Sequence, residues 1–183
     1  MKKQIDNSIY LHEVTQVVDI HTHVLPQMDD GSHSVEESLE MLRLLRRQGV
    51  DTVVATPHFY PTMECPDDFI YHRSTSAEML VKAAKGHEDE LPKVCLGAEL
   101  PYFEGIGNSK ALPLFCFEGT KTVLVEMPFK KWSEATVNEI IKMKRVSGLD
   151  VAIAHIERYA KYQSGKTLDR LISEGIAFQM NCE

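Results

Sequence analysis

The sequence has few cysteines, and none of them are close neighbours. Among its 183 residues it holds four, at Cys65, Cys95, Cys116 and Cys182, with no Cys-x-x-Cys pair. Zinc knuckles and dithiol redox centres need closely spaced thiols, so neither class of site is indicated. We therefore expect reduced thiols, most of them buried.

Long apolar segments and an excess of positive charge are missing as well. No run approaches the roughly 18 apolar residues of a membrane span, and the amino terminus continues into the polar residues Asp6, Asn7 and Ser8. Lys and Arg total 20 against 27 Asp and Glu, a net charge of −7. This balance argues against binding to nucleic acid or to an anionic membrane surface. We expect a cytoplasmic protein without membrane insertion.

What the sequence does contain is the composition of an ordinary globular protein. Hydrophobic residues make up 43% of the chain and charged residues 26%, and no internal repeat or low-complexity segment stands out. A chain of this length fits one domain. We expect a single domain over residues 1–183, with residues 1–16 as an N-terminal extension ahead of the first strand.

Short β-branched segments alternate along the chain with longer segments of helical period. Strands are predicted at residues 17–21, 51–56, 94–96, 123–125, 151–154 and 176–180. Helices are predicted at residues 34–48, 67–85, 133–148 and 168–173. Ser34 and Glu37 are spaced as in a capping box at a helix start. Apolar strands separated by helices indicate an α/β fold with a parallel sheet or barrel.

Residue types that bind metal ions follow each of the first five predicted strands. They are His21 and His23, His58, Glu99, Glu126, and His155. In parallel α/β folds the carboxyl ends of the strands converge on one face, where active sites form. His21 and His23 are two residues apart, so an extended chain directs both rings to the same side. We infer a metal site with several ions on this face.

Each of these features has a plainer explanation when it is taken alone. A His-x-His pair arises by chance or on a surface, Asp29-Asp30-Gly31 is a common turn sequence, and Arg158 suits a surface ion pair. Chance, however, would have to place a metal-binding residue at the same end of every strand. A carboxylate straight after an apolar strand, as at Glu99 and Glu126, is also costly to bury without a cation. Jointly the residues favour the metal site.

The mixture of imidazole and carboxylate without cysteine limits the metal. Zn²⁺, Mn²⁺ and Fe²⁺ suit this set of side chains, and a carboxylate can bridge two such ions. The pattern leaves the choice among these metals open. A substrate phosphate would need local positive charge, which bound metal or an arginine can supply.

Six short motifs carry a resemblance to a known family. They are Asp19-Ile20-His21-Thr22-His23, Asp29-Asp30-Gly31, Thr56-Pro57-His58, Gly97-Ala98-Glu99, Val125-Glu126 and Ala154-His155-Ile156-Glu157-Arg158-Tyr159. In order and spacing, residues 17–181 resemble the polymerase-and-histidinol-phosphatase (PHP) superfamily. Within it, the chain is similar to the bacterial manganese-dependent protein-tyrosine phosphatases encoded beside capsule and exopolysaccharide genes.

The resemblance implies a distorted TIM-like (β/α)7 PHP barrel with a trinuclear metal site. The implied ligands are His21 and His23 for one ion, Glu99 as a bridge to a second ion with Glu126 and His155, and Asp30 and His58 for the third. About two to three divalent transition-metal ions are expected. Manganese is the first choice, with iron and zinc as alternatives.

The resemblance also implies the chemistry. Arg158 would bind the substrate phosphate, and the expected catalytic residues are Arg158, Asp30 and His58. Metal-bound hydroxide would attack phosphorus in line while the cations and the arginine neutralise the equatorial oxygens. The expected substrate is a phosphotyrosine protein, a bacterial tyrosine kinase of exopolysaccharide or capsule synthesis. A homo-oligomer is compatible with the sequence.

Two departures from the family pattern bear on these expectations. Ile156 stands where the family usually has proline, and relatives continue into a Ser-Asp-x-His motif that this chain lacks. The expectation is therefore a barrel without its C-terminal βα units and a site without two ligands. Two alternatives follow: a small-molecule phosphatase of the histidinol-phosphate type, and a catalytically impaired metal-binding module.

Overall fold

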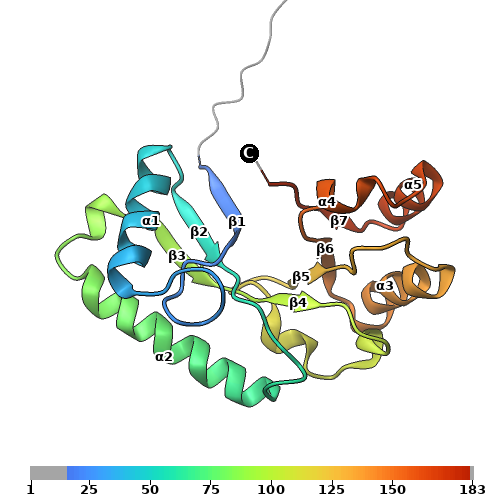
Figure 1. Ribbon diagram of the computed structural model, residues 1–183, viewed down its shortest axis with the longest axis horizontal. Coiled ribbons are helices and arrows are strands. Elements are labelled where there is room, and N and C mark those ends of the chain that lie inside the picture. The colour runs from blue at the N-terminus through green and yellow to red at the C-terminus, as the bar shows by residue number, and fades with distance from the viewer. Residues whose placement is uncertain (1–15, 182–183) are drawn as a thin grey trace, which may run out of the picture.

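The computed structural model in Figure 1 describes residues 16–181, so Cys182 and all but Gln16 of the predicted N-terminal extension lie outside it. The strands are β1 (Val18–Thr22), β2 (Thr52–Ala55), β3 (Lys93–Leu96), β4 (Glu99–Pro101), β5 (Thr122–Glu126), β6 (Asp150–Ile153) and β7 (Ala177–Phe178). The α-helices are α1 (Val35–Arg47), α2 (Pro66–Ala84), α3 (Glu134–Ser147), α4 (Glu157–Ala160) and α5 (Gly165–Ser173). Short 3₁₀ helices are η1 (Glu88–Glu90), η2 (Ile106–Asn108) and η3 (Leu112–Phe115).

The strands form two parallel sheets, one in the order β1-β2-β3 and the other in the order β4-β5-β6-β7. In the part of the chain that the structure describes, a single parallel bridge between His58 and Glu99 joins them. It is made by two backbone hydrogen bonds of 3.0 Å, in which Glu99 donates to the carbonyl of Pro57 and Phe59 donates to the carbonyl of Glu99. The segment after β2 therefore leaves the first sheet and runs beside the start of the second.

The predicted α/β class with parallel strands is confirmed. A closed barrel is not: within residues 16–181, β1 is an edge strand of the first sheet, β7 is an edge strand of the second, and the two are not paired with each other. Figure 1 shows the two sheets meeting near the middle of the molecule, at the end of β2 and the start of β4. The position of this junction decides where the strand ends converge.

The helices cover the outer faces of the two sheets (Figure 1). In the first half, Val53 of β2 packs in one cluster with Leu42 of α1 and Leu80 of α2. Its neighbour Val54 points to the opposite face and packs with Leu124 of β5. Successive strand residues are thus buried on opposite faces, which explains why these strands are apolar throughout and not alternating.

Helix ends agree with the predicted signals, with one difference. Helix α3 begins after Ser133, whose side chain accepts a hydrogen bond from the Thr136 backbone, and ends at Gly148 in the left-handed conformation (φ 69°). At α1, Ser34 accepts from the Glu37 backbone at 3.1 Å, but the Glu37 carboxylate accepts from the backbone of His33. In a capping box the Glu37 carboxylate would accept from the backbone N–H of Ser34. Here it accepts from the preceding residue, His33.

Three other expectations need correction. Helix α5 begins at Gly165, earlier than residue 168, because Ser164 caps it. The last strand, predicted over residues 176–180, covers only Ala177–Phe178, because the chain then turns to bond with the segment after β6. Within residues 16–181 the cysteines are free but not mostly buried, since Cys65 is exposed while Cys95 and Cys116 are partly exposed.

Within residues 16–181, no helix combines the length and the apolar character that crossing a lipid bilayer requires. The longest helix, α2, spans Pro66–Ala84 and carries charged residues along its length, including Asp67, Arg73 and Lys82. Its buried positions face the first sheet and the loop after β2.

Candidate metal centre

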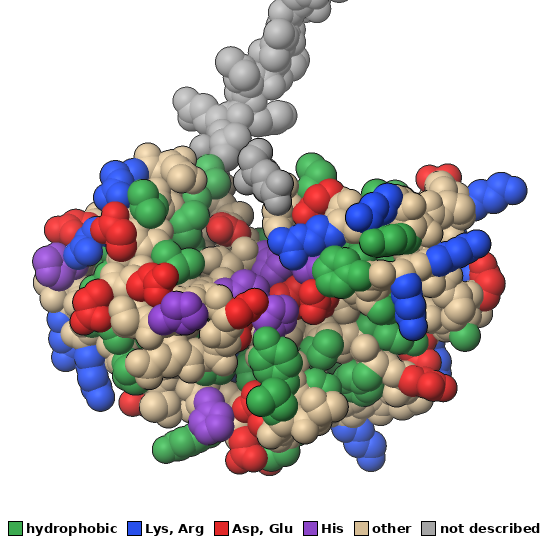
Figure 2. Space-filling view, in the orientation of Figure 1, with side chains coloured by type: hydrophobic (Ala, Val, Ile, Leu, Met, Phe, Trp, Pro, Cys, Tyr) green, Lys and Arg blue, Asp and Glu red, His purple; other side chains and the backbone are tan. Residues whose placement is uncertain are grey.

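Histidine and acidic side chains gather in a hollow between the two halves of the molecule (Figure 2). The hollow has a volume of about 830 Å³. All eight residues singled out in the sequence line it: His21, His23, Asp30, His58, Glu99, Glu126, His155 and Arg158. The carboxyl ends of the strands therefore bring together residues that are up to 137 positions apart, from His21 to Arg158.

Glu99 is the centre of this cluster and is 1% exposed. It opens strand β4, whereas the sequence suggested a position just past β3; the chain bends between the two strands at Gly97-Ala98. A Cβ atom at Gly97 would lie 2.8 Å from the Phe117 ring, so only glycine fits at the bend. Arg73 holds the same place by donating to the Gly97 carbonyl at 2.6 Å. These contacts fix the backbone that carries the carboxylate.

Strand β1 supplies two imidazoles to one oxygen of Glu99. His21 Nε2 lies 3.1 Å and His23 Nε2 lies 3.3 Å from Glu99 Oε2. The two Nε2 atoms are themselves 3.3 Å apart. As predicted from the spacing of two residues, both rings point to the same side of the strand.

The second oxygen of Glu99 faces the end of β6. His155 Nε2 lies 3.0 Å from Glu99 Oε1 and 3.5 Å from Glu126 Oε1. His155 is 2% exposed, and its Nδ1 has no hydrogen-bond partner among the described residues. Its backbone has a positive φ of 33°, which is uncommon for a residue with a side chain. A strained, buried histidine held against two carboxylates is typical of a functional site.

His58 and Asp30 lie at the open end of the cluster. His58 Nδ1 is 3.3 Å from Glu99 Oε2, and His58 Nε2 is 3.8 Å from Asp30 Oδ1. The Asp30 side chain is 82% exposed, so it borders the hollow without being buried in it. Ligand atoms of His23, Asp30 and His58 nevertheless lie within 4.8 Å of one another.

Asp29, which the sequence analysis placed only in a turn, orients two of the histidines. Its carboxylate accepts from His23 Nδ1 at 2.6 Å and from the His58 backbone at 2.8 Å. It also accepts from the Gly31 backbone at 3.0 Å, which is the turn itself. The Asp-Asp-Gly sequence indicated the turn, but it could not tell which of the two carboxylates points inward.

Gln179 was missed altogether. Its side-chain oxygen accepts from His21 Nδ1 at 3.0 Å and from the His155 backbone at 2.7 Å. A carboxamide oxygen can only accept, so Nδ1 of His21 donates to Gln179, and Nε2 is the ring nitrogen that faces Glu99. Gln179 follows β7 directly, but the predicted strand ran to residue 180, so the rule used for the other strand ends did not reach it.

The charges in the cluster are strongly coupled. Burial acts to raise the pKa of Glu99, but hydrogen bonds from His155, His21 and His23 hold it well below its usual range. Burial acts to lower the pKa of His23, yet its bonds with Asp29 and Glu99 raise it to about 10. Burial likewise opposes charge on His155, and its bonds with Glu126 and Glu99 raise that pKa to about 9.

The donor set fits divalent metal ions. Three ring nitrogens converge on one carboxylate oxygen, and two of them face each other at 3.3 Å, where only a proton or a cation can stabilise the contact. Three groups have ligand atoms within 4.8 Å of one another: His21, His23 and Glu99; His23, Asp30 and His58; His58, Glu99 and Glu126. Imidazole and carboxylate are the ligands of transition-metal hydrolases.

Arg158 lies on α4, three residues after His155, and borders the same hollow. Its guanidinium Nε is 3.9 Å from the Glu157 carboxylate, at the limit of an ion pair, and the side chain is 47% exposed. The surface ion pair that the sequence left open is thus long and leaves most of the fork-shaped donor group free to bind an anion.

Fold and site together define a parallel α/β protein with a buried cluster of histidines and carboxylates suited to divalent metal ions. The chain belongs to the CpsB/CapC family of capsular polysaccharide synthesis, whose sequence model matches residues 17–183. The resemblance inferred from the motifs is thereby confirmed at the level of the family.

Relatives with curated names agree with this family. The tyrosine-protein phosphatase CpsB of Streptococcus agalactiae serotype III (strain NEM316) is 28% identical over 169 residues, which cover 90% of this chain and 67% of the relative. The tyrosine-protein phosphatase YwqE of Bacillus subtilis (strain 168) is 28% identical over 179 residues, covering 90% of this chain and 64% of YwqE. The chain thus spans about two thirds of the length of these relatives.

A solved structure matches as well. It comes from the crystallographic work on YwqE from Bacillus subtilis and CpsB from Streptococcus pneumoniae, described as unique metal-dependent tyrosine phosphatases. The TM-score is 0.74 at 28% identity, over 90% of this chain and 66% of the other. The predicted class of enzyme, a metal-dependent tyrosine phosphatase, is the class to which these relatives belong.

Proposed function

We propose that this chain is a metal-dependent protein-tyrosine phosphatase that hydrolyses a phosphomonoester in the hollow between the two sheets. The observation that carries the proposal is the buried Glu99, whose two oxygens lie 3.0–3.3 Å from ring nitrogens of four histidines. The negative charge of a buried carboxylate is costly unless positive charge compensates it. Cations bound by the surrounding histidines would supply that positive charge. The names of the relatives support the substrate class.

The proposed ligand sets follow the three parts of the cluster. His21, His23 and Glu99 would hold one ion, Glu99, Glu126 and His155 would hold a second, and Asp30 and His58 would hold a third. About two to three divalent ions are proposed, manganese first. When bound, such ions act as Lewis acids toward phosphate and make water a better nucleophile at neutral pH.

The chain's own residues have separate roles in this proposal. Arg158, half-exposed at the hollow, binds the substrate phosphate through its guanidinium donors and balances charge that develops on the phosphoryl oxygens. Asp29 and Gln179 orient His23 and His21 by accepting from their Nδ1 atoms. Asp30 and His58 stand at the solvent side of the cluster, and we propose them as catalytic residues beside the ion that they would hold.

The shape of the site favours a protein substrate over a small metabolite. The hollow is open, and Asp30 and Arg158 at its edge are 82% and 47% exposed. A phosphotyrosine side chain on a protein surface can reach such a site, whereas a phosphorylated metabolite is better recognised by an enclosing pocket. We propose a bacterial tyrosine kinase as the substrate. A cytoplasmic location and a homo-oligomer stay predictions of the sequence.

The finer fold assignment also belongs to the proposal. We infer one domain in which the two sheets are consecutive parts of a distorted TIM-like PHP barrel. Val54, Leu124 and Ala152, from β2, β5 and β6, pack together on the face away from the helices, as side chains in a barrel interior do. The TM-score of 0.74 against a phosphatase of the same family supports this reading.

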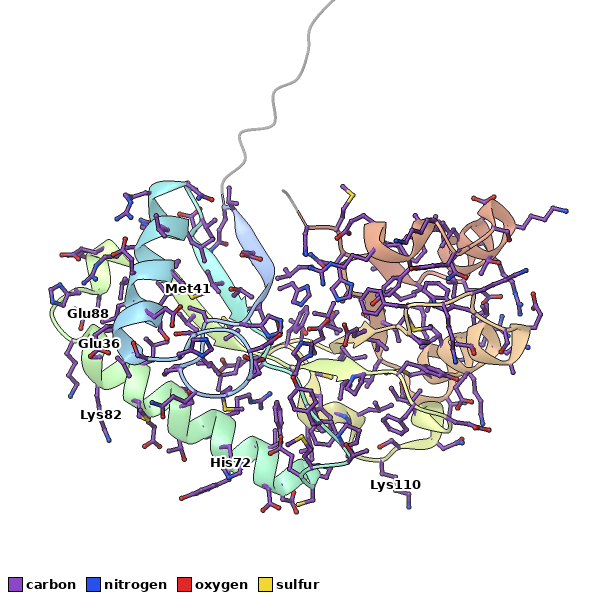
Figure 3. All side chains as sticks on the ribbon, viewed as in Figure 1. Glu36, Met41, His72, Lys82, Glu88 and Lys110 are labelled. Carbon is purple, nitrogen blue, oxygen red and sulfur yellow. The ribbon has the colours of Figure 1, made fainter. Side chains whose placement is uncertain are left out.

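The proposal is tested by hydrolysis of a phosphotyrosyl peptide with added Mn²⁺. We expect His21→Ala to abolish release of phosphate, while His72→Ala leaves it unchanged. His72 is the matched control, because it lies on α2 (Figure 3), does not line the hollow, and among residues 16–181 forms an ion pair only with Glu64. Full activity after strong chelation would rule out the metal-dependent mechanism. Faster turnover of histidinol phosphate than of the peptide would instead favour the small-molecule alternative.

A further inference from the structure

Two exposed aromatic rings lie against histidines of the site. The Phe129 ring is nearly parallel to that of His155, with centroids 6.0 Å apart and an angle of 9°, and Phe129 is 53% exposed. The Tyr60 ring lies 5.5 Å from that of His58, at 37°, and Tyr60 is 37% exposed. His58 and His155 contact opposite oxygens of the Glu99 carboxylate. The two rings therefore border two different parts of the same cluster.

The backbone around Phe129 is held rigidly, although its ring is half exposed. The Phe129 ring packs against the buried Tyr159 ring, with the two ring centroids 5.1 Å apart. Tyr159 Oη accepts from the Met127 backbone at 3.1 Å, and Trp132 Nε1 donates to the Pro128 carbonyl at 3.1 Å. Buried neighbours thus fix the loop while leaving one side of the Phe129 ring open to solvent. Because this apolar surface is already ordered, a ligand that binds to it loses little free energy to the ordering of the loop.

Tyr60 is fixed in a similar way. Its neighbour Phe59 is 4% exposed and bonds by its backbone to Glu99, so the segment that carries Tyr60 is part of the junction between the sheets. The Tyr60 ring therefore lies on a fixed segment beside the His58 ring.

We propose that Phe129 and Tyr60 form an aromatic entrance that recognises the phenyl ring of an aryl phosphate. This inference rests on the proposed function, since it places the phosphoryl group at the cluster. In an aryl ester the ring is bonded to the ester oxygen, so it would leave the cluster beside Phe129, which stacks on His155, and Tyr60, which lies at an angle to His58. Aromatic pairs at centroid distances of about 4.5–7 Å are attractive beyond their area of contact. An alkyl phosphate offers no π face to either ring.

Binding of two phosphonates isolates the contribution of the ring from the chemical step. Phenylphosphonate carries the ring and methylphosphonate does not, and neither is hydrolysed. Their affinities for the full chain loaded with Mn²⁺ are measured by calorimetry. We expect Phe129→Ala to weaken phenylphosphonate binding by about 2- to 10-fold and to leave methylphosphonate binding unchanged. Phe129→Leu, which keeps apolar bulk, should lie between the two.

A matched control separates this effect from a general loss of an exposed aromatic. Tyr71 on α2 is 69% exposed and also lies beside a histidine, with ring centroids 5.9 Å apart, but that histidine, His72, pairs with Glu64 and is not one of the histidines around Glu99. Tyr71→Ala should change neither affinity. For Tyr60, Tyr60→Ala should weaken phenylphosphonate selectively, whereas Tyr60→Phe should retain its binding, because the ring and not the hydroxyl makes the contact.

The outcomes separate this inference from the proposed function. Equal weakening of both phosphonates in Phe129→Ala, or loss of metal, would show that Phe129 only shields His155 and would overturn the inference. No change in phenylphosphonate binding in either alanine variant would overturn it too. If the wild-type chain prefers phenylphosphonate through Phe129 yet hydrolyses no phosphomonoester with Mn²⁺, the aromatic entrance is supported and the proposed function fails.

Discussion

The side-chain oxygen of Gln179 accepts the backbone N–H of His155 at 2.7 Å, across the gap between β7 and the end of β6. The same oxygen accepts from His21 Nδ1 at 3.0 Å. The Gln179 backbone makes two further bonds, to Ile153 and Ile156, on either side of His155. One glutamine therefore positions histidines from opposite ends of the chain, including the one with the strained backbone.

Replacing Gln179 by leucine should weaken metal binding, because His21 and His155 lose their common acceptor. Removal of such outer partners typically costs about 10- to 100-fold in metal affinity. Gln179→Glu keeps an acceptor oxygen and should retain most of the affinity. Competition with a chromogenic chelator measures the affinity, and urea unfolding of the metal-free protein shows whether the fold is intact. Equal affinities in wild type and Gln179→Leu would contradict this role.

Asp29 and Asp30 are adjacent but should behave differently. Asp29→Ala leaves the partly buried backbone N–H groups of His58 and Gly31 without an acceptor, which costs at most about 1–3 kcal/mol for each group. Asp30 is 82% exposed, so Asp30→Ala should leave the free energy of unfolding of the metal-free protein within about 0.5 kcal/mol of wild type. Urea denaturation without metal measures both. If the two variants lower the free energy of unfolding by the same amount, the predicted difference between Asp29 and Asp30 is wrong.

Arg158→Ala should weaken phosphate binding while the metals stay bound. A hydrogen bond to a charged group is worth about 1.5–3 kcal/mol, so we expect inorganic phosphate to bind roughly 10- to 100-fold more weakly. Arg145→Ala is the control variant, because the Arg145 side chain is 66% exposed and pairs with Glu174 away from the hollow. Calorimetry with Mn²⁺-loaded protein gives the affinities. Loss of metal in Arg158→Ala would mean that the arginine has a structural role instead.

Metal binding at pH 7 should release protons. The pKa of His23 is raised to about 10 and that of His155 to about 9, so both rings are protonated at pH 7 in the metal-free protein. Metal ions bind the unprotonated ring, so binding should release about two protons. Calorimetric titration in buffers of different ionisation enthalpy counts them. A binding heat that is the same in every buffer would count against this prediction.

The same shifts set the pH dependence of the metal-free fold. Both folded pKa values lie above the usual 6.5 of histidine, so their contribution to stability is fully present below about pH 6.5. It is lost as the pH rises through about 9 and then about 10. The free energy of unfolding without metal should therefore fall between pH 7 and pH 10, which urea titrations at several pH values can follow.

Much of the site could be predicted because its residues obey one rule of parallel sheets. His21, His58 and His155 each stand at a strand end, and the carboxyl ends of parallel strands meet on one face. Spacing within a strand also fixed the shared direction of His21 and His23. The caps Ser133 and Gly148 likewise marked a helix from local chemistry alone.

What could not be predicted depends on the path of the chain between elements. The bend at Gly97 that starts a new strand at Glu99 is set by packing against Phe117, a residue distant in sequence. Which carboxylate of Asp29 and Asp30 turns inward depends on where the His23 ring lies. Gln179 was overlooked because its amide acts on histidines through hydrogen bonds, and its residue type gives no sign of this.

The central claim is that Glu99 holds together a site for several metal ions. The most direct test is the metal content of wild type and Glu99→Gln after incubation with Mn²⁺ and removal of free ion by dialysis, with His72→Ala as control. We predict about two to three ions per wild-type chain and per His72→Ala chain, and about one or none in Glu99→Gln. A folded Glu99→Gln protein that retains the full number of ions would contradict the claim.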